Sequence, residues 1–151
     1  MLSFYLSYPQ RNPKARFPGL NITVSDFKAI KWIHNRHSEY DYIVLSNQLI
    51  SAAALTKYSF AKYFNTPTGE IFYYSVPTGS LLYQQYGKML YEGQKRQYMI
   101  DAMNLVGVKK AYFILNSYWA GFDKIKKGAE QTADSWTVID EGKVWIFEYN
   151  R

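Results

Sequence analysis

Residues 42–48, which read YIVLSNQ, decide the fold, because four apolar β-forming residues are followed directly by three polar ones. A continuous apolar run of this length is typical of a strand buried on both faces, as strands of parallel sheets are. Two later runs have the same character: residues 71–74 read IFYY and residues 111–115 read AYFIL. Segments with helical spacing of apolar residues separate these runs. The alternation predicts parallel strands joined by right-handed helical crossovers.

Five segments show this helical spacing, and the last part of the chain has the pattern of a hairpin. The expected helices cover residues 25–37, 49–64, 82–92, 94–106 and 122–133. We expect Ser25 to cap the first helix and Asp26 to complement its dipole. Residues 135–149 hold two strand-like runs around the turn Asp-Glu-Gly-Lys, which indicates a β-hairpin.

These elements predict the fold class α/β. We expect three layers, with a mostly parallel sheet of about five to six strands, helices on both faces and a C-terminal antiparallel β-hairpin. Residues 1–22 contain three of the five prolines and three basic residues, which is typical of an N-terminal arm or linker. Residues 23–151 have the length of one α/β domain.

The composition is that of a globular protein and excludes some kinds of site. Apolar residues make up 48% of the 151 residues and charged residues 20%, and the chain is rich in aromatics, with 15 Tyr, 9 Phe and 4 Trp. Because cysteine is absent, disulfides, thiolate zinc sites and cysteine nucleophiles are excluded. No run approaches the roughly 20 apolar residues of a membrane span. The sequence as it stands is therefore expected to be soluble.

The net charge of +6 permits attraction to nucleic acid, anionic lipid or phosphorylated ligands. The basic residues are scattered through several segments with acids between them, and the familiar nucleic-acid-binding motifs are missing, which argues against a nucleic-acid partner. His34 and His37 are the only histidines. Two such ligands are one short of a catalytic zinc site, and a solvated helix end explains them equally well, so we expect no metal.

Three polar segments follow the apolar runs, and they are the candidate ligand-binding residues. In open α/β sheets, ligands bind outside the carboxyl ends of the parallel strands, where loops and helix N-termini converge. The candidates are Ser46, Asn47 and Gln48 after the first run, Thr78, Gly79 and Ser80 after the second, and Asn116, Tyr118 and Trp119 after the third.

Each candidate segment has a structural interpretation beside the functional one. Residues 78–80 could hold an anion at a helix start, or simply cap that helix. They lack the spacing of a P-loop, so the sequence indicates no nucleotide site. Asn116 and the rings of Tyr118 and Trp119 could hold a sugar, although Trp119 could equally pack in the core.

No catalytic residue can be assigned from the sequence. The G-x-S-x-G pattern of a nucleophile elbow is missing. The aspartates lie at expected helix starts, turns and solvent faces, where capping and solvation account for them, and no pair of carboxylates stands out. We therefore expect no cofactor and no catalytic activity from this chain alone.

The order of segments resembles the soluble domain that follows the membrane-spanning part of GT-C type glycosyltransferases and related polytopic membrane proteins. The resemblance is carried by the acidic-start helix at residues 25–33, the strand at 42–45, the Gly-Val-led strand at 107–114 and the hairpin at 136–147. Residues 119–123 read WAGFD where oligosaccharyltransferases have WWDYG, so glycan-transfer chemistry is not part of what the resemblance implies.

The resemblance implies a non-catalytic extracytosolic domain of a larger membrane protein. Such a domain would contact a sugar, a lipid-linked substrate or a partner through the strand-end loops, with the membrane-spanning region of the same protein as a further partner. The alternative that the residues leave open is a free-standing cytoplasmic α/β enzyme or small-ligand binder, in which the same loops take phosphate or sugar.

Overall fold

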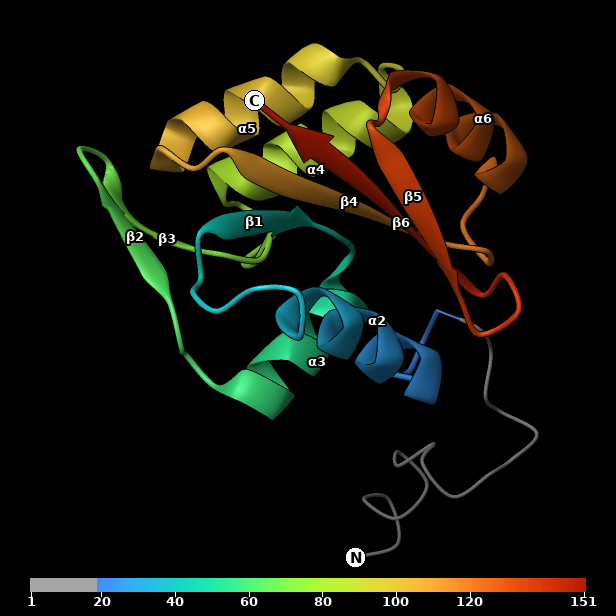
Figure 1. The fold of residues 1–151 in the computed structure, drawn as a ribbon, viewed down its shortest axis with the longest axis horizontal. Helices are drawn as coiled ribbons and strands as arrows, with labels where there is room; N and C mark the ends of the chain where they lie inside the picture. Colours follow the sequence, from blue (N-terminus) through green and yellow to red (C-terminus); the bar gives the residue numbers. More distant parts are fainter. Residues whose placement is uncertain (1–18) are drawn as a thin grey trace, which may run out of the picture.

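Four strands form the central sheet, in the order β1-β4-β6-β5, in the computed structural model, which describes residues 19–151 (Figure 1). They are β1 (Tyr42–Leu45), β4 (Lys110–Asn116), β6 (Val144–Asn150) and β5 (Ser135–Ile139). β1 lies parallel to β4, whereas β6 is antiparallel to both of its neighbours. All four residues of β1, and all of β4 except the first, are buried, as their continuous apolar runs predict.

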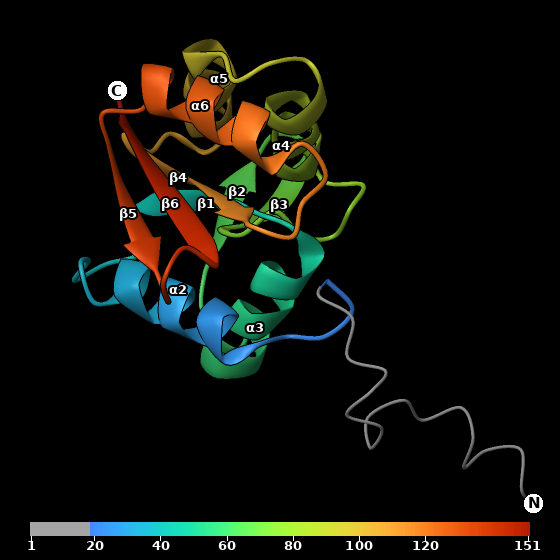
Figure 2. The same cartoon turned by 90° about the vertical axis from the view of Figure 1, so that its right-hand side faces the viewer.

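Helices cover both faces of this sheet, with an apolar cluster under each set (Figure 2). On one face lie α2 (Val24–His34) and α3 (Gln48–Tyr58). On the other face lie α4 (Leu81–Tyr91), α5 (Arg96–Val106) and α6 (Phe122–Thr132). The expected α/β class with helices on both faces is thus confirmed, as is the C-terminal hairpin of β5 and β6.

The expected number of strands and the expected mostly parallel arrangement of the sheet are wrong. Among the described residues the sheet has four strands instead of five or six, and only one of its three strand pairs is parallel. The reason is that the C-terminal hairpin does not sit at the far edge as an addition. Its second strand, β6, pairs directly with β4 through seven residues and so occupies a central place in the sheet.

A second antiparallel hairpin occupies a stretch in which we expected helix. The expected helix over residues 49–64 ends at Tyr58, where Ser59 takes a positive φ of 54°. Residues Tyr63–Thr66 then form β2, which pairs with β3 (Gly69–Phe72) and projects from the body of the molecule (Figure 1). Tyr63 and Phe64, which fell within the expected helix, are β-formers, and the Pro-Thr-Gly turn after them closes a hairpin.

The start of α2 differs by two residues from the expectation. Thr23, and not Ser25, is the N-cap, and it forms a reciprocal capping box with Asp26. Ser25 lies inside the first turn, is buried, and donates a hydrogen bond to Asp140 in the turn between β5 and β6. The helix also ends at His34, earlier than the expected residue 37. Residues 1–18, most of the expected arm, lie outside the described residues.

Candidate functional site

The polar ends of three strand segments meet at one edge of the sheet, which we call the rim. β1 and β4 are parallel and in register from Tyr42 and Lys110 to Leu45 and Phe113, so their carboxyl ends lie together. Residues 73–75 continue beyond β3 and run parallel to β1 on its other side: the N–H of Val44 donates to the carbonyl of Tyr73 at 2.8 Å, and that of Ser75 to the carbonyl of Val44 at 3.1 Å. The expectation that these three exits share one edge is confirmed.

Three buried serines tie two of these strand ends and α3 together. Ser75 accepts a hydrogen bond from the backbone N–H of Ser46 at 2.8 Å and donates its hydroxyl to the carbonyl of Ser46 at 2.7 Å. The hydroxyls of Ser46 and Ser51 are hydrogen-bonded at 3.0 Å. All three residues are fully buried. The polar groups of Ser46 are therefore engaged within the protein.

A second buried chain of hydrogen bonds joins the start of α3, the end of β4 and the start of α2. The Asn47 amide donates to the Asn116 carbonyl at 2.8 Å and to the Tyr118 hydroxyl at 3.0 Å, while its own carbonyl caps α3 by accepting from the N–H of Ile50. Asn116 in turn donates to Asp26 at 2.9 Å. We call Asp26, Asn47, Asn116 and Tyr118 the rim network.

The carboxylate at the end of this network is fully buried and well supplied with donors. One oxygen of Asp26 accepts from Asn116, and the other accepts from the backbone N–H of Thr23 at 2.7 Å and from its hydroxyl at 2.9 Å. Its place in the first turn of α2 adds the favourable end of the helix dipole. Burial, followed by the charge of Asp26, raises the pKa of Tyr118 to about 12, so that the Tyr118 hydroxyl stays protonated at neutral pH.

The other predicted site residues have several environments. Gln48, Thr78 and Gly79 are exposed. Ser80 is the N-cap of α4, where it accepts from the N–H of Tyr83 at 3.1 Å. Trp119 is half-buried and packs edge-on against Tyr86 of α4, with ring centroids 6.2 Å apart. Among the predicted site residues, the exposed groups are therefore one amide, one hydroxyl and a glycine backbone, with parts of the Tyr118 and Trp119 rings, while the buried polar side chains bond to one another.

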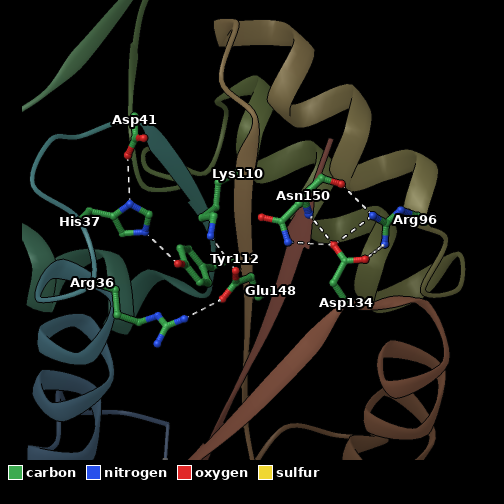
Figure 3. A network of polar contacts seen from close by, with 9 residues as sticks. All are labelled: Arg36, His37, Asp41, Arg96, Lys110, Tyr112, Asp134, Glu148 and Asn150. Atoms are coloured by element: carbon green, nitrogen blue, oxygen red, sulfur yellow. Dashed lines mark hydrogen bonds and ion pairs between the residues drawn. The ribbon is translucent and has the colours of Figure 1, made fainter.

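A different polar cluster lies at the opposite edge of the sheet, around Tyr112 (Figure 3). His37 holds both of its ring nitrogens in contacts: Nδ1 lies 3.0 Å from Asp41, and Nε2 lies 2.8 Å from the Tyr112 hydroxyl. Its ring also lies on that of Tyr42, with centroids 4.2 Å apart. Burial lowers the pKa of His37, and the opposing charge of Asp41 offsets this only in part.

Next to Tyr112 on the neighbouring strand, Glu148 is held by two cations (Figure 3). Lys110 lies 2.7 Å from the carboxylate and Arg36 3.5 Å from it. Burial and the charge of Glu148 raise the pKa of Tyr112 to about 12. Although Asp41, His37 and Tyr112 follow one another like a proton relay, the chain ends on a fully buried hydroxyl. The cluster thus fastens the segment after α2 to β4 and β6.

A third group of contacts clamps the C-terminal end of β6 (Figure 3). Arg96 at the start of α5 lies 2.8 Å from Asp134 and donates to the backbone carbonyl of Asn150 at 2.7 Å. Asp134 also accepts from the N–H of Asn150. The hydrogen bond from Arg96 is the main cause that lowers the pKa of Asp134. The side chains of Arg96 and Asp134 are about one-third exposed, so water weakens this pair.

The two histidines that could form a metal pair have separate partners. His34 stacks on Tyr58 of α3 at 4.2 Å between centroids, whereas His37 binds Asp41 and Tyr112. Within residues 19–151 no group of three His, Cys, Asp or Glu side chains is placed to hold a metal ion. None of the described helices combines the length and hydropathy needed to cross a bilayer.

Sequence reasoning missed Asp26 as a member of the site and missed the cluster around Tyr112. The spacing of His37 and Asp41, four residues apart, was the available signal for one contact of that cluster. Nothing in the sequence marks Glu148 as a neighbour of Tyr112, because the register of β4 against β6 sets that pairing.

No protein-family model, curated protein or solved structure was found to match this chain.

Proposed function

We propose that this chain is a non-catalytic domain of a larger membrane protein of the glycosyltransferase-like type, placed on its extracytosolic side. In this proposal the domain contacts a sugar, a lipid-linked substrate or a partner through the exposed part of the rim. The observation that carries the proposal is the rim network. It uses a buried carboxylate and two buried amides to fix the strand ends.

The network favours a supporting role because its polar groups are already paired. A general acid, general base or nucleophile must reach the reacting atoms, at hydrogen-bond distance or through one water. Asp26, Asn47 and Asn116 are at most 4% exposed and bond to one another. Such a network is suited to holding a contact surface rigid, since each buried polar group has its partner.

The exposed part of the rim has the chemistry of a carbohydrate contact. Gln48 and Thr78 supply an exposed amide and an exposed hydroxyl, and the half-buried rings of Tyr118 and Trp119 supply flat apolar faces. Sugars offer the same combination of hydroxyls and apolar faces, and aromatic residues with a polar handle suit such mixed surfaces. The firm attachment of Tyr118 through Asn47 lowers the entropy lost when a ligand binds.

An amide-shift titration tests the rim. Mannose, N-acetylglucosamine, inorganic phosphate and adenosine monophosphate are added separately to the ¹⁵N-labelled chain. We expect a sugar to shift the amides of Gln48, Tyr118 and Trp119. Shifts only at residues 78–80 with phosphate would favour the free-standing phosphate binder instead. If none of the probes shifts any rim amide, ligand binding by the rim is wrong.

Two pairs of variants test whether the sugar-induced amide shifts depend on the rim or on exposed polar side chains in general. Gln48→Ala with Thr78→Ala removes the exposed amide and the exposed hydroxyl of the predicted site residues and should abolish the sugar shifts. The matched control, Gln97→Ala with Thr56→Ala, removes an exposed amide and an exposed hydroxyl elsewhere and should retain them. Equal loss in both pairs would contradict the assignment.

The membrane part of the proposal has its own test. The protein is isolated from its native cells with an antibody against this domain and its intact mass is measured. We expect a product much heavier than 17.7 kDa that partitions with the membrane fraction. A free product of 17.7 kDa in the aqueous fraction would overturn the proposal and support the free-standing alternative.

A further inference from the structure

A groove with both apolar and basic walls lies along the outer side of the α2 and α3 layer. It measures about 310 Å³ and is lined by Val24, Phe27, Lys28, Lys31 and Lys57. Lys28 is paired with Asp140 at 2.6 Å. Lys31 and Lys57 are exposed and form no ion pair within residues 19–151. Two unpaired cations thus border an apolar hollow.

Two exposed aliphatic side chains lie at or just before the start of α2, and one of them lines this groove. Leu20 is 65% exposed and Val24 is 69% exposed, and both belong to the segment that enters α2. Single exposed apolar residues are ordinary on protein surfaces. Here, however, Val24 lines the same groove as the lysines. Aliphatic tips beside lysines are the arrangement with which peripheral helices enter the boundary between lipid headgroups and acyl chains.

The helices α2 and α3 carry basic side chains that no exposed acid on the same helices balances. Together they contain three lysines, Lys28, Lys31 and Lys57. In α2 and α3 the only acidic residue is Asp26, which is fully buried and hydrogen-bonded. The outer surface of these two helices therefore presents lysines without exposed carboxylates of its own, and it complements a negatively charged surface.

We propose that the α2 and α3 layer docks on an anionic lipid bilayer, with Leu20 and Val24 at the headgroup boundary and Lys31 and Lys57 against anionic headgroups. This inference rests on the proposed function, in which the domain belongs to a membrane protein. A nucleic acid would satisfy the lysines but would leave the aliphatic residues without a role, since it is bound through phosphate contacts and base stacking.

The docking surface adjoins the rim, so docking on a bilayer would also position the rim relative to that bilayer. Gly19 lies against the ring of Tyr118, close enough that a β-carbon at residue 19 would come within 3.1 Å of it. The segment 19–24 therefore connects Tyr118 of the rim with Val24 of the groove. A bilayer held against Leu20 and Val24 would bring the rim near the headgroups, where a lipid-linked substrate presents its sugar.

Vesicle co-sedimentation with the 151-residue chain tests the docking. The vesicles are pure phosphatidylcholine, or phosphatidylcholine with 30% phosphatidylglycerol, at low salt. We expect binding to the anionic vesicles only. Each lysine near an anionic surface contributes about a fivefold gain in partitioning, so Lys31→Ala with Lys57→Ala should weaken binding roughly 25-fold. The matched control, Lys124→Ala with Lys127→Ala, removes two exposed lysines of α6 on the other face of the sheet and should change binding less than about twofold.

The aliphatic residues distinguish a bilayer from other anions. Leu20→Ser with Val24→Ser keeps the charge and should weaken vesicle binding about tenfold. Circular dichroism checks that each variant is folded, as expected for exposed positions. Any of three results would overturn the proposal: no binding to anionic vesicles, equal loss of vesicle binding in the two lysine pairs, or binding to single-stranded DNA that is tighter than binding to vesicles and unchanged by Leu20→Ser with Val24→Ser. None of these results bears on the rim titration or the intact mass, so the two proposals can fail separately.

Discussion

The rim network makes a quantitative prediction for Asn116→Ala. The side chain of Asn116 donates to the buried Asp26 carboxylate at 2.9 Å and accepts from the Asn47 amide at 2.8 Å. A hydrogen bond to a charged group contributes about 1.5–3 kcal/mol, and a neutral one about 1 kcal/mol. Asp26 keeps its two contacts with Thr23, so the loss is partial. We therefore expect the free energy of unfolding to fall by about 2.5–3 kcal/mol, in the lower part of the summed range.

Urea denaturation followed by tryptophan fluorescence measures this change. With an m-value of about 2 kcal/mol per molar urea, the midpoint should fall by roughly 1.2–1.5 M. Tyr118→Phe removes only one acceptor, at a half-buried position, and should cost less than about 1 kcal/mol. Asn65→Ala, at an exposed position of β2, should stay within about 0.5 kcal/mol of the original. A loss below about 1 kcal/mol for Asn116→Ala would refute the reasoning, because the buried amide would then not be holding its partners.

Three further predictions concern single positions. Burial lowers the folded-state pKa of His37 below its ordinary 6.5, so the unfolded chain takes up the proton first and the stability of the fold decreases as the pH drops through 6.5. Between pH 7.5 and 5.5, the free energy of unfolding should fall by up to about 1 kcal/mol more in the original chain than in His37→Gln. An equal pH dependence in both proteins would exclude His37 as the cause. Tyr74→Phe should raise the unfolding free energy by about 1 kcal/mol, because the buried hydroxyl has no hydrogen-bond partner within residues 19–151; a lowered melting temperature would show that it has one. Ser59→Gly should stabilise by about 1 kcal/mol in urea, since residue 59 has a φ of 54°, and an unchanged midpoint would argue against strain there.

The parts of the fold that could be predicted from sequence are those with a local cause. The buried runs at residues 42–45 and 111–115 became adjacent parallel strands because their uninterrupted apolar pattern suits burial on both faces. Residues 63–66 were misassigned because a short run of aromatic residues after a helix fits either period. The place of β6 between β4 and β5 depends on pairing between residues that are 28 to 40 positions apart in the sequence, which no local pattern specifies.

In the candidate site, too, the features with a local cause could be predicted and those that depend on distant residues could not. Three strand exits were expected at one edge, and Ser46, Asn47 and Asn116 do meet there. The burial of Asn47 and Asn116 was not foreseen, because their side chains belong to a network that ends on Asp26, which is 90 residues away from Asn116 along the chain and enters the network through its helix cap. The resemblance to GT-C type domains stays a prediction, and so does the ligand of the rim.

The central claim is that the rim network binds the strand ends to one another. Side-chain amide NMR measures it directly, through nuclear Overhauser contacts and proton exchange of the two asparagine NH₂ groups. The structure predicts cross-peaks from the Asn47 amide to the Tyr118 ring and slow exchange for both Asn47 and Asn116. Rapid exchange with water and no contact to the ring would contradict the account.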